Sequence, residues 1–324
     1  SAVGEYFGVT VQDPRPEGAK GRAEDGYIHI ISLLDADGIR RILANIVTNF
    51  TGFAPLGTVL VALLGVGIAE RAGLLSAVMR LVVMKAPRKM TTLAIVFAGI
   101  MSDTAAELGY VVLIPLSAII FHSLGRHPLA GIAAAFAGVS GGYSANLLLG
   151  TIDPLLSGIT QQAARIIDPS YIVGAEANWY FMFVSTFLIT FLGYIITEKI
   201  VEPQLGPYNG NELDDEETDL KNAAQVTPLE KKALWAATGT FIVMAIILAF
   251  TVVPENGILR NQETGLIGNS PFLKSIVVFI FLFFAIPGIV YGWIAKTMRS
   301  DKDIVDAMAN SMSTLGLYLV IIFF

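Results

Sequence analysis

The sequence predicts an all-α polytopic membrane protein, and three observations carry this prediction. Of the 324 residues, 54% are hydrophobic and 15% are charged, and the mean hydropathy is +0.65. A soluble domain has about 25% charged residues. Several apolar runs reach the roughly 20 residues that a helix needs to cross a bilayer. These features exclude a disordered chain and an ordinary cytosolic enzyme.

Charge and cysteine content narrow the class of protein further. The formal net charge is −6, and most of the acidic excess lies within residues 212–219. The chain therefore lacks the basic surface that is typical of a nucleic-acid-binding protein. It has no cysteine and three scattered histidines, which excludes thiol catalysis and thiolate metal sites. We expect no cofactor and no nucleic-acid partner.

Hydropathy and turn residues divide the chain into membrane and water-facing segments. Residues 1–37 are polar and rich in Gly and Pro, which predicts an extracytoplasmic loop. Residues 38–90 are predicted to be membrane helices that lead to a basic cytoplasmic loop. Further membrane segments are expected at residues 91–121, 129–165, 177–198, 233–253 and 272–295, with an acidic cytoplasmic loop at 199–232 and the start of another membrane helix at 304–324.

Residues 91–121 are predicted to form a re-entrant hairpin. Lys and Arg placement puts both ends of this segment on the cytoplasmic side. About 30 residues are too many for one untilted span and too few for two. The carboxylates of Asp103 and Glu107 lie between two apolar arms. Non-helical backbone at membrane depth is tolerated only where it is buried in protein or lines a cavity, so the hairpin tip is a candidate functional site.

Residues 129–165 are predicted to be a membrane helix that is broken in its middle. The residues at the break are Ser140, Gly141, Gly142, Ser144 and Asn146. A second interruption at residues 151–154 places Asp153 directly before a proline. The exposed ends of half-helices can hold an anion and a cation. A hairpin followed by a broken helix is typical of one half of a secondary transporter.

Two stretches of the sequence resemble the p-aminobenzoyl-glutamate transporter family, AbgT. They are SDTAAELGYVVLIPL at residues 102–116 and AGVSGGYSANLLLGTIDPLLSGI at residues 137–159. The resemblance extends over essentially the whole chain, and residues 140–154 are its most specific part. The hairpin tip is also similar to the Ser-Asn-Thr tip of sodium/dicarboxylate symporters, with Asp103 in the place of Asn.

The resemblance implies a multi-pass homodimer in the bacterial inner membrane. A scaffold would hold a transport core of two inverted repeats, each with a hairpin and a broken helix. Family members continue beyond the point where this sequence stops, so we expect a piece of a longer protein with its second repeat truncated. The implied substrates are anionic aromatic molecules: p-aminobenzoyl-glutamate, a folate catabolite, and in some members sulfonamide antimetabolites that are exported.

The candidate ligands for substrate and ion lie at the hairpin tip and at the helix break. At the tip they are Ser102, Asp103, Thr104 and Glu107. A charge at membrane depth costs about 2.5–3.5 kcal/mol. This cost favours a functional role for the tip carboxylates over their placement in a solvated loop between two ordinary spans. Asp103 and Asp153 are candidate Na⁺ ligands, and the coupling ion is either Na⁺ or H⁺. Capping of the following helix is an equally weighted role for Asp153.

The residues leave three other functions open. A sodium/dicarboxylate-type symporter fits the hairpin tip. An intramembrane enzyme would use Asp103 and Glu107 as an acid and a base, but no intramembrane His or Cys accompanies them. A channel is compatible with the apolar spans, although a broken helix suits a gated site better than a continuous pore. We therefore predict a cation-coupled secondary transporter and not an enzyme.

Overall fold

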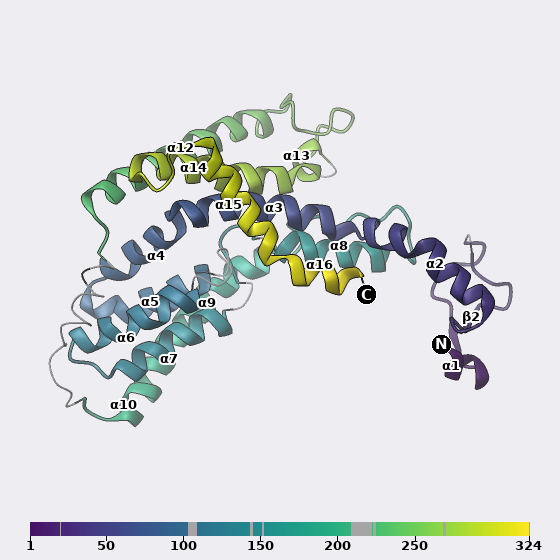
Figure 1. Cartoon of the computed structure of the whole chain (residues 1–324), viewed down its shortest axis with the longest axis horizontal. Coiled ribbons are helices and arrows are strands. Elements are labelled where there is room, and N and C mark those ends of the chain that lie inside the picture. The colour runs from purple at the N-terminus through teal and green to yellow at the C-terminus, as the bar shows by residue number, and fades with distance from the viewer. Residues whose placement is uncertain are drawn as a thin grey trace.

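The structure is a computed structural model that describes residues 1–19, 21–102, 109–142, 145–150, 152–208, 222, 225–267 and 270–323. Almost all regular structure in these ranges is helical, in agreement with the predicted class. Figure 1 shows α12 and α14 together at the top, α5, α6, α7 and α9 below, and α3 and α4 between these two groups. The N-terminal elements lie at one end, away from the helical body.

The N-terminal segment has more structure than the predicted loop. The elements are the short helix α1 (Ala2–Tyr6) and the antiparallel strands β1 (Thr10–Gln12) and β2 (Tyr27–His29). Helix α2 (Ala36–Thr51) follows. Asp35 is its N-cap, and the Asp35 side chain accepts a hydrogen bond from the Gly38 N–H at 2.6 Å. An Asp at this position satisfies one of the free N–H groups of the first turn.

Four helical stretches in the described residues are long and apolar enough to cross a membrane. They are Ala36–Ala72, Trp179–Leu205, Pro228–Val252 and Ile276–Ala295. The first contains α2 and α3 (Ala54–Ala72), and the second contains α9 (Trp179–Ile196), the π-helix η5 (Thr197–Val201) and α10 (Glu202–Leu205). The last two are α12 and α14, and α13 (Pro271–Lys274) precedes α14.

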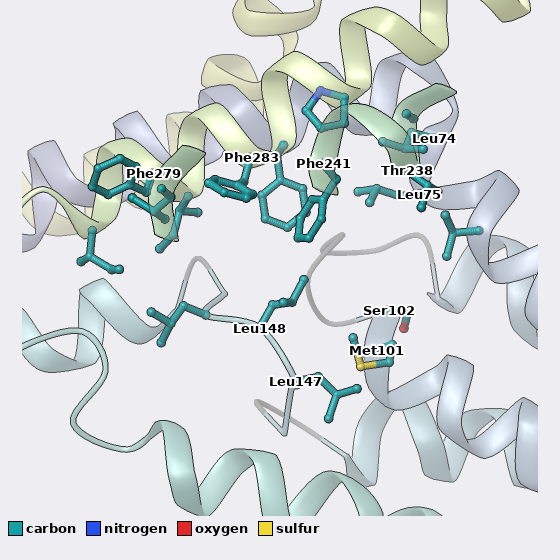
Figure 2. A pocket seen from close by; sticks show the side chains of 18 of the residues that line it. Leu74, Leu75, Met101, Ser102, Leu147, Leu148, Thr238, Phe241, Phe279 and Phe283 are labelled. Carbon is teal, nitrogen blue, oxygen red and sulfur yellow. The ribbon is translucent and has the colours of Figure 1, made fainter. Parts of the chain in front are cut away.

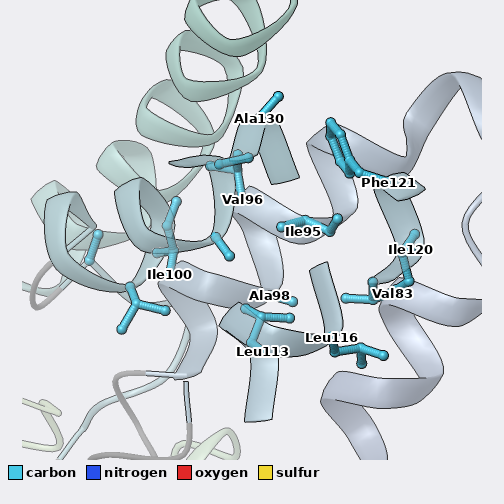
Figure 3. Close-up of a cluster of buried hydrophobic side chains, with 14 residues drawn as sticks. Val83, Ile95, Val96, Ala98, Ile100, Leu113, Leu116, Ile120, Phe121 and Ala130 are labelled. Atoms are coloured by element: carbon cyan, nitrogen blue, oxygen red, sulfur yellow. The ribbon is translucent and has the colours of Figure 1, made fainter. Parts of the chain in front are cut away.

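One buried cluster, here called the hairpin core, joins the elements of the predicted hairpin and of the first half of the broken helix (Figure 3). These elements are α5 (Thr91–Met101), the π-helix η3 (Gly109–Leu113), α6 (Ile114–Ser123), α7 (Pro128–Phe136) and the π-helix η4 (Ala137–Gly141). Ile95, Leu113 and Phe121 are among its fully buried side chains. Because lipid tails are as apolar as these side chains, close van der Waals packing rather than removal from water stabilises this core within a bilayer.

A second group of buried residues, here called the α3–α14 core, joins α3, α12, α14 and α15 (Asp301–Thr314). Close approach of α3 and α14 depends on glycine: a Cβ at Gly65 would lie 2.4 Å from the Phe281 carbonyl oxygen. Helix α4 (Leu74–Met84) lies between the two cores, with Val83 in the hairpin core and Ala77 in the α3–α14 core. A short 3-10 turn, η1 (Arg88–Met90), then leads to α5.

Two expected boundaries are wrong. Helix α8 (Ile152–Ala164) already begins at Ile152 and includes Asp153 in its first turn. Residues 152–154 therefore belong to this helix and do not form a second interruption. Proline is tolerated in the first turn of a helix, so Pro154 does not mark its start. The expected helix over residues 304–324 is divided into α15 and α16 (Gly316–Phe323), with a break at Leu315.

Candidate functional site

The structure describes six of the predicted site residues and brings them to two neighbouring places. They are Ser102, Ser140, Gly141, Gly142, Asn146 and Asp153. The other four, Asp103, Thr104, Glu107 and Ser144, lie outside the described residues. Within the described part of the chain, no three His, Asp or Glu side chains form a group that could hold a metal ion.

The first place is the junction between the two arms of the hairpin and the helix break. Ser102, at the end of α5, is 1% exposed and donates a hydrogen bond to the Gly99 carbonyl oxygen at 2.6 Å. A Cβ at Gly109, where the second arm begins, would lie 2.1 Å from the Ser102 Oγ and 2.8 Å from a Val139 methyl group. The two arms and η4 therefore meet without room for another side chain.

The same junction includes Gly142 of the break, whereas a Cβ at Gly141 would meet nothing within 4 Å among the described residues. A Cβ at Gly142 would lie 2.5 Å from Ile100 Cγ1, and a Cβ at Gly138 would lie 2.6 Å from the Val96 carbonyl oxygen. The backbones of α5 and η4 thus touch directly at Gly138, and the Ile100 side chain packs against Gly142. Ser102 and Gly109, the described residues that flank the predicted hairpin tip, therefore lie at one site with the helix break.

A hydrogen bond between two π-helical segments closes this junction on its outer side. The hydroxyl groups of Tyr110 on η3 and Ser140 on η4 lie 2.8 Å apart. The Tyr110 ring also packs edge-on against Phe136 with ring centroids 6.2 Å apart, within the range of about 4.5–7 Å that such pairs prefer. π-Helical turns are frequent at functional sites. Sequence reasoning missed Tyr110, although its place in the stretch that resembles AbgT was a signal.

The second place is the extended backbone between η4 and α8, where Asn146 and Asp153 flank Gly150. Asn146 is 3% exposed, and its Oδ1 accepts a hydrogen bond from the Leu148 N–H at 3.1 Å. Asp153 Oδ2 accepts one from the Gly150 N–H at 2.6 Å. This bond, together with the position of Asp153 in the first turn of α8, is a helix-stabilising contact for a carboxylate. An ion-binding role for Asp153 stays a prediction.

A cavity of about 530 Å³ separates the hairpin core from α12 and α14 (Figure 2). Met101 and Ser102 face it from the hairpin, and the extended backbone contributes Leu147 and Leu148. The opposite wall is largely aromatic and includes Phe241, Phe279 and Phe283. Ser102 therefore belongs both to the hairpin–break junction and to the lining of the cavity.

Trp179 connects the cavity to α9. Its side chain lines the cavity, and its Nε1 donates a hydrogen bond to the Leu147 carbonyl oxygen at 3.1 Å. A buried Trp N–H usually has such a partner, and here the bond holds the extended backbone against the start of α9.

An ion-pair cluster lies where the hairpin begins and ends. Arg126, in the turn between α6 and α7, donates to Thr92 Oγ1 at 2.9 Å, so the start of α5 and the end of α6 lie together. It also pairs with Glu198 and Glu202. Burial alone would lower the pKa of Arg126, but the hydrogen bonds to Glu202 and Glu198 outweigh it and raise the pKa. Sequence reasoning missed this cluster.

Comparison with known proteins identifies the architecture. The model of the AbgT putative transporter family matches residues 1–324. The chain is 36% identical over 324 residues to the p-aminobenzoyl-glutamate transport protein of Escherichia coli (strain K12) and spans 61% of its length. That share means that the chain corresponds to about three fifths of this relative.

Two solved structures have the same fold. One is that of Neisseria gonorrhoeae MtrF, described as illuminating a class of antimetabolite efflux pumps, with 69% identity and a TM-score of 0.89. The other is that of the Alcanivorax borkumensis YdaH transporter, described as having an unusual topology, with 40% identity and a TM-score of 0.85. Each alignment covers 99% of this chain, and the matched parts are 63% and 65% of those chains.

These matches confirm the predicted class, a transporter family rather than an enzyme family. The chain is an integral membrane protein, and a bacterial inner membrane is consistent with its relatives. With the family model matched from the first residue to the last, the chain belongs to the AbgT putative transporter family.

Proposed function

We propose that the full-length protein is a cation-coupled secondary transporter of p-aminobenzoyl-glutamate and related aromatic anions. The names of the relatives support this substrate class and include both a p-aminobenzoyl-glutamate transport protein and antimetabolite efflux pumps. The observation that carries the proposal is that Ser102 belongs both to the hairpin–break junction and to a cavity with an aromatic wall. One polar place and one aromatic place suit an amphipathic anion.

The two ends of the substrate would use these two places. Its carboxylate end would lie at the hairpin tip and the helix break, with Ser102, Thr104, Ser140, Ser144 and Asn146 as candidate partners and the backbone of Gly141 and Gly142 as further donors. The aminobenzoyl ring would stack in the cavity, where aromatic pairs contribute about 0.5–1.5 kcal/mol beyond burial. Succinate has no group for the aromatic wall, which favours this substrate over a dicarboxylate.

The coupling ion is Na⁺ or H⁺, and Asp103, Glu107 and Asp153 are its candidate ligands or proton acceptors. We further propose that the protein works as a homodimer and exports sulfonamide antimetabolites as an antiporter. Both proposals extend the names of the relatives to this chain. The membrane itself is its other partner.

The role of Ser102 has a matched control in the same hairpin. Ser117 on α6 is also buried and also donates to the carbonyl oxygen three residues earlier, Ile114, at 2.6 Å, but it does not line the cavity. Full-length protein in proteoliposomes should take up labelled p-aminobenzoyl-glutamate. Ser102→Ala should raise the apparent KM about two- to tenfold, the value of one hydrogen bond, and Ser117→Ala should leave it unchanged. Equal effects would refute a substrate contact at Ser102.

Coupling is tested by replacing the carboxylates with amides. Asp153→Asn keeps an oxygen for the Gly150 N–H, so the helix start is preserved while the charge is lost. Flux driven by a Na⁺ or a pH gradient should fall in Asp103→Asn and in Asp153→Asn. If both variants keep gradient-driven flux, carboxylate coupling is wrong. Competition by succinate as strong as by unlabelled substrate would instead favour a dicarboxylate symporter.

A further inference from the structure

The cluster around Arg126 joins elements that are far apart in the chain. The guanidinium donates from Nε to Glu202 Oε1 at 2.9 Å, from Nη2 to Glu198 Oε1 at 2.7 Å, and from Nη1 to Thr92 Oγ1 at 2.9 Å. Thr92 Oγ1 in turn donates to Glu198 Oε1 at 2.5 Å. One side chain thus holds the start of α5, the end of α6 and the end of the α9 stretch together.

The geometry of this cluster differs from that of an ordinary surface ion pair. The Arg126 side chain is 18% exposed, and the two carboxylate side chains are 28% and 24% exposed. Its guanidinium carbon lies 4.1 Å from the ring centroid of the fully buried Phe121. Glu198 and Glu202 lie four residues apart, on one face of η5 and α10. Exposed pairs contribute little, but a partly buried guanidinium with several charge-assisted hydrogen bonds contributes more.

The packing of α9 supports the same conclusion as the ion pairs, namely that α9 is attached to the hairpin core. Ile189 packs against the hairpin core, and so do Val201 and Leu205 farther along the stretch. A Cβ at Gly193 would lie 2.8 Å from a Val96 methyl group, so α9 and α5 touch closely. Among the described residues, the buried side chains of the α3–α14 core include none from α9.

We infer that Arg126 is a positioning residue that fastens α9 to the hairpin, so that α9 moves with the hairpin core when the cavity between the two cores changes shape. The inference rests on the proposed transport function and adds to it which helices form the moving part. Arg126 acts through Thr92, Glu198 and Glu202 and has no contact with the cavity lining. Helices α12 and α14, which form the opposite wall of the cavity, belong to the part that does not move with the hairpin core.

Cysteine cross-linking tests this inference, because the chain has no cysteine of its own. The test uses the full-length protein in proteoliposomes, with any cysteine outside these 324 residues replaced by serine. Val96→Cys with Gly193→Cys is the test pair, because a Cβ at Gly193 would lie 3.7 Å from the Val96 Cβ, a separation that suits a disulfide, and this pair keeps the whole Arg126 cluster. Met101→Cys with Phe241→Cys is the control pair, because these residues face each other across the cavity walls.

The expected result is a contrast between the two pairs. The Val96/Gly193 pair should form a disulfide at the same rate with and without an ion gradient and substrate, and flux should stay within about twofold after it forms. Cross-linking of the Met101/Phe241 pair by a longer bifunctional thiol reagent should change in rate with the gradient and should stop flux, and a reductant should restore it. If the disulfide at Val96/Gly193 stops flux reversibly, or its rate of formation follows the gradient, the inference is overturned.

A rescue experiment separates positioning from a general loss of stability. Arg126→Gln should lower flux about tenfold, and adding the Val96/Gly193 disulfide to this variant should restore it. Failure of the disulfide to restore flux in folded, monodisperse protein would overturn the inference. The cross-linking rates do not depend on the identity of the substrate, so they judge the role of Arg126 even if p-aminobenzoyl-glutamate is not carried. Absence of flux in the parent protein would count against the proposed function alone.

Discussion

Gly138→Ala is the substitution that tests the close contact of α5 and η4 most directly. A Cβ at Gly138 would lie 2.6 Å from the Val96 carbonyl oxygen and 3.1 Å from the Gly99 Cα. Ordinary contacts begin near 3.4 Å, so the two segments would have to separate by roughly 0.8 Å. Overpacking of this kind costs about 1–3 kcal/mol. Because Ser102 lies one turn beyond Gly99, the separation should also widen the hairpin–break junction.

The measurement is the free energy of unfolding of the purified full-length protein in detergent, from reversible denaturant titration. Gly239→Ala on α12 is the matched control, because an added Cβ there meets nothing within 4 Å. It should leave the protein unchanged or stabilise it by about 0.5–1 kcal/mol, the helix preference of Ala over Gly. If Gly138→Ala is as stable as the parent protein, α5 and η4 do not touch in the way described, and the junction would have to be rebuilt.

Three further predictions concern polar contacts. Glu230→Gln loses the charge that pairs with Arg80 at 2.6 Å, so the free energy of unfolding should fall by about 1 kcal/mol in the same titration; no change would show that the pair is neutral. Hydrogen bonding to Arg15 lowers the pKa of Asp13 from 3.8 to about 2. A lowered pKa stabilises the folded segment above pH 3.8, and this contribution is lost as the pH falls towards 2. Hydrogen exchange of residues 1–35, corrected for its intrinsic pH dependence, should therefore accelerate over that range in the parent protein, and the same acceleration in Asp13→Asn would contradict the assignment. Tyr110→Phe removes the hydroxyl bond to η4 and should lower flux about two- to fivefold at unchanged thermal stability; normal flux would make this bond dispensable.

The sequence alone could predict features that depend on local chemistry. The glycine pair at 141 and 142 marked the end of η4, because glycine weakens a helix and polar neighbours replace lost backbone partners. The helix start near Asp153 was placed two residues too late. Proline suggested the first helical position, but the Asp153 carboxylate binds back to the Gly150 N–H and the helix already begins at Ile152.

Contacts between distant parts of the chain could not be predicted in this way. Tyr110 and Ser140 are 30 residues apart, and Arg126 is 72 and 76 residues from Glu198 and Glu202. Hydropathy and spacing report on neighbours within one helix and carry no information on which helices pack together. For the same reason, the hydrogen bond of Trp179 to the Leu147 carbonyl oxygen became visible only in the structure.

The place of α4 between the two cores has a mechanical consequence. This helix has 11 residues and shares side chains with both cores, and it contains no Pro or Gly at which it could kink. Any relative displacement of the cores must therefore be taken up at its ends. One end is Gly73, whose φ of +87° is open to glycine and strained for other residues, and the other is the turn at Pro87 before η1. Helix α4 then moves as a rigid element, and the flexibility of the backbone at its two ends limits how far the hairpin core can be displaced.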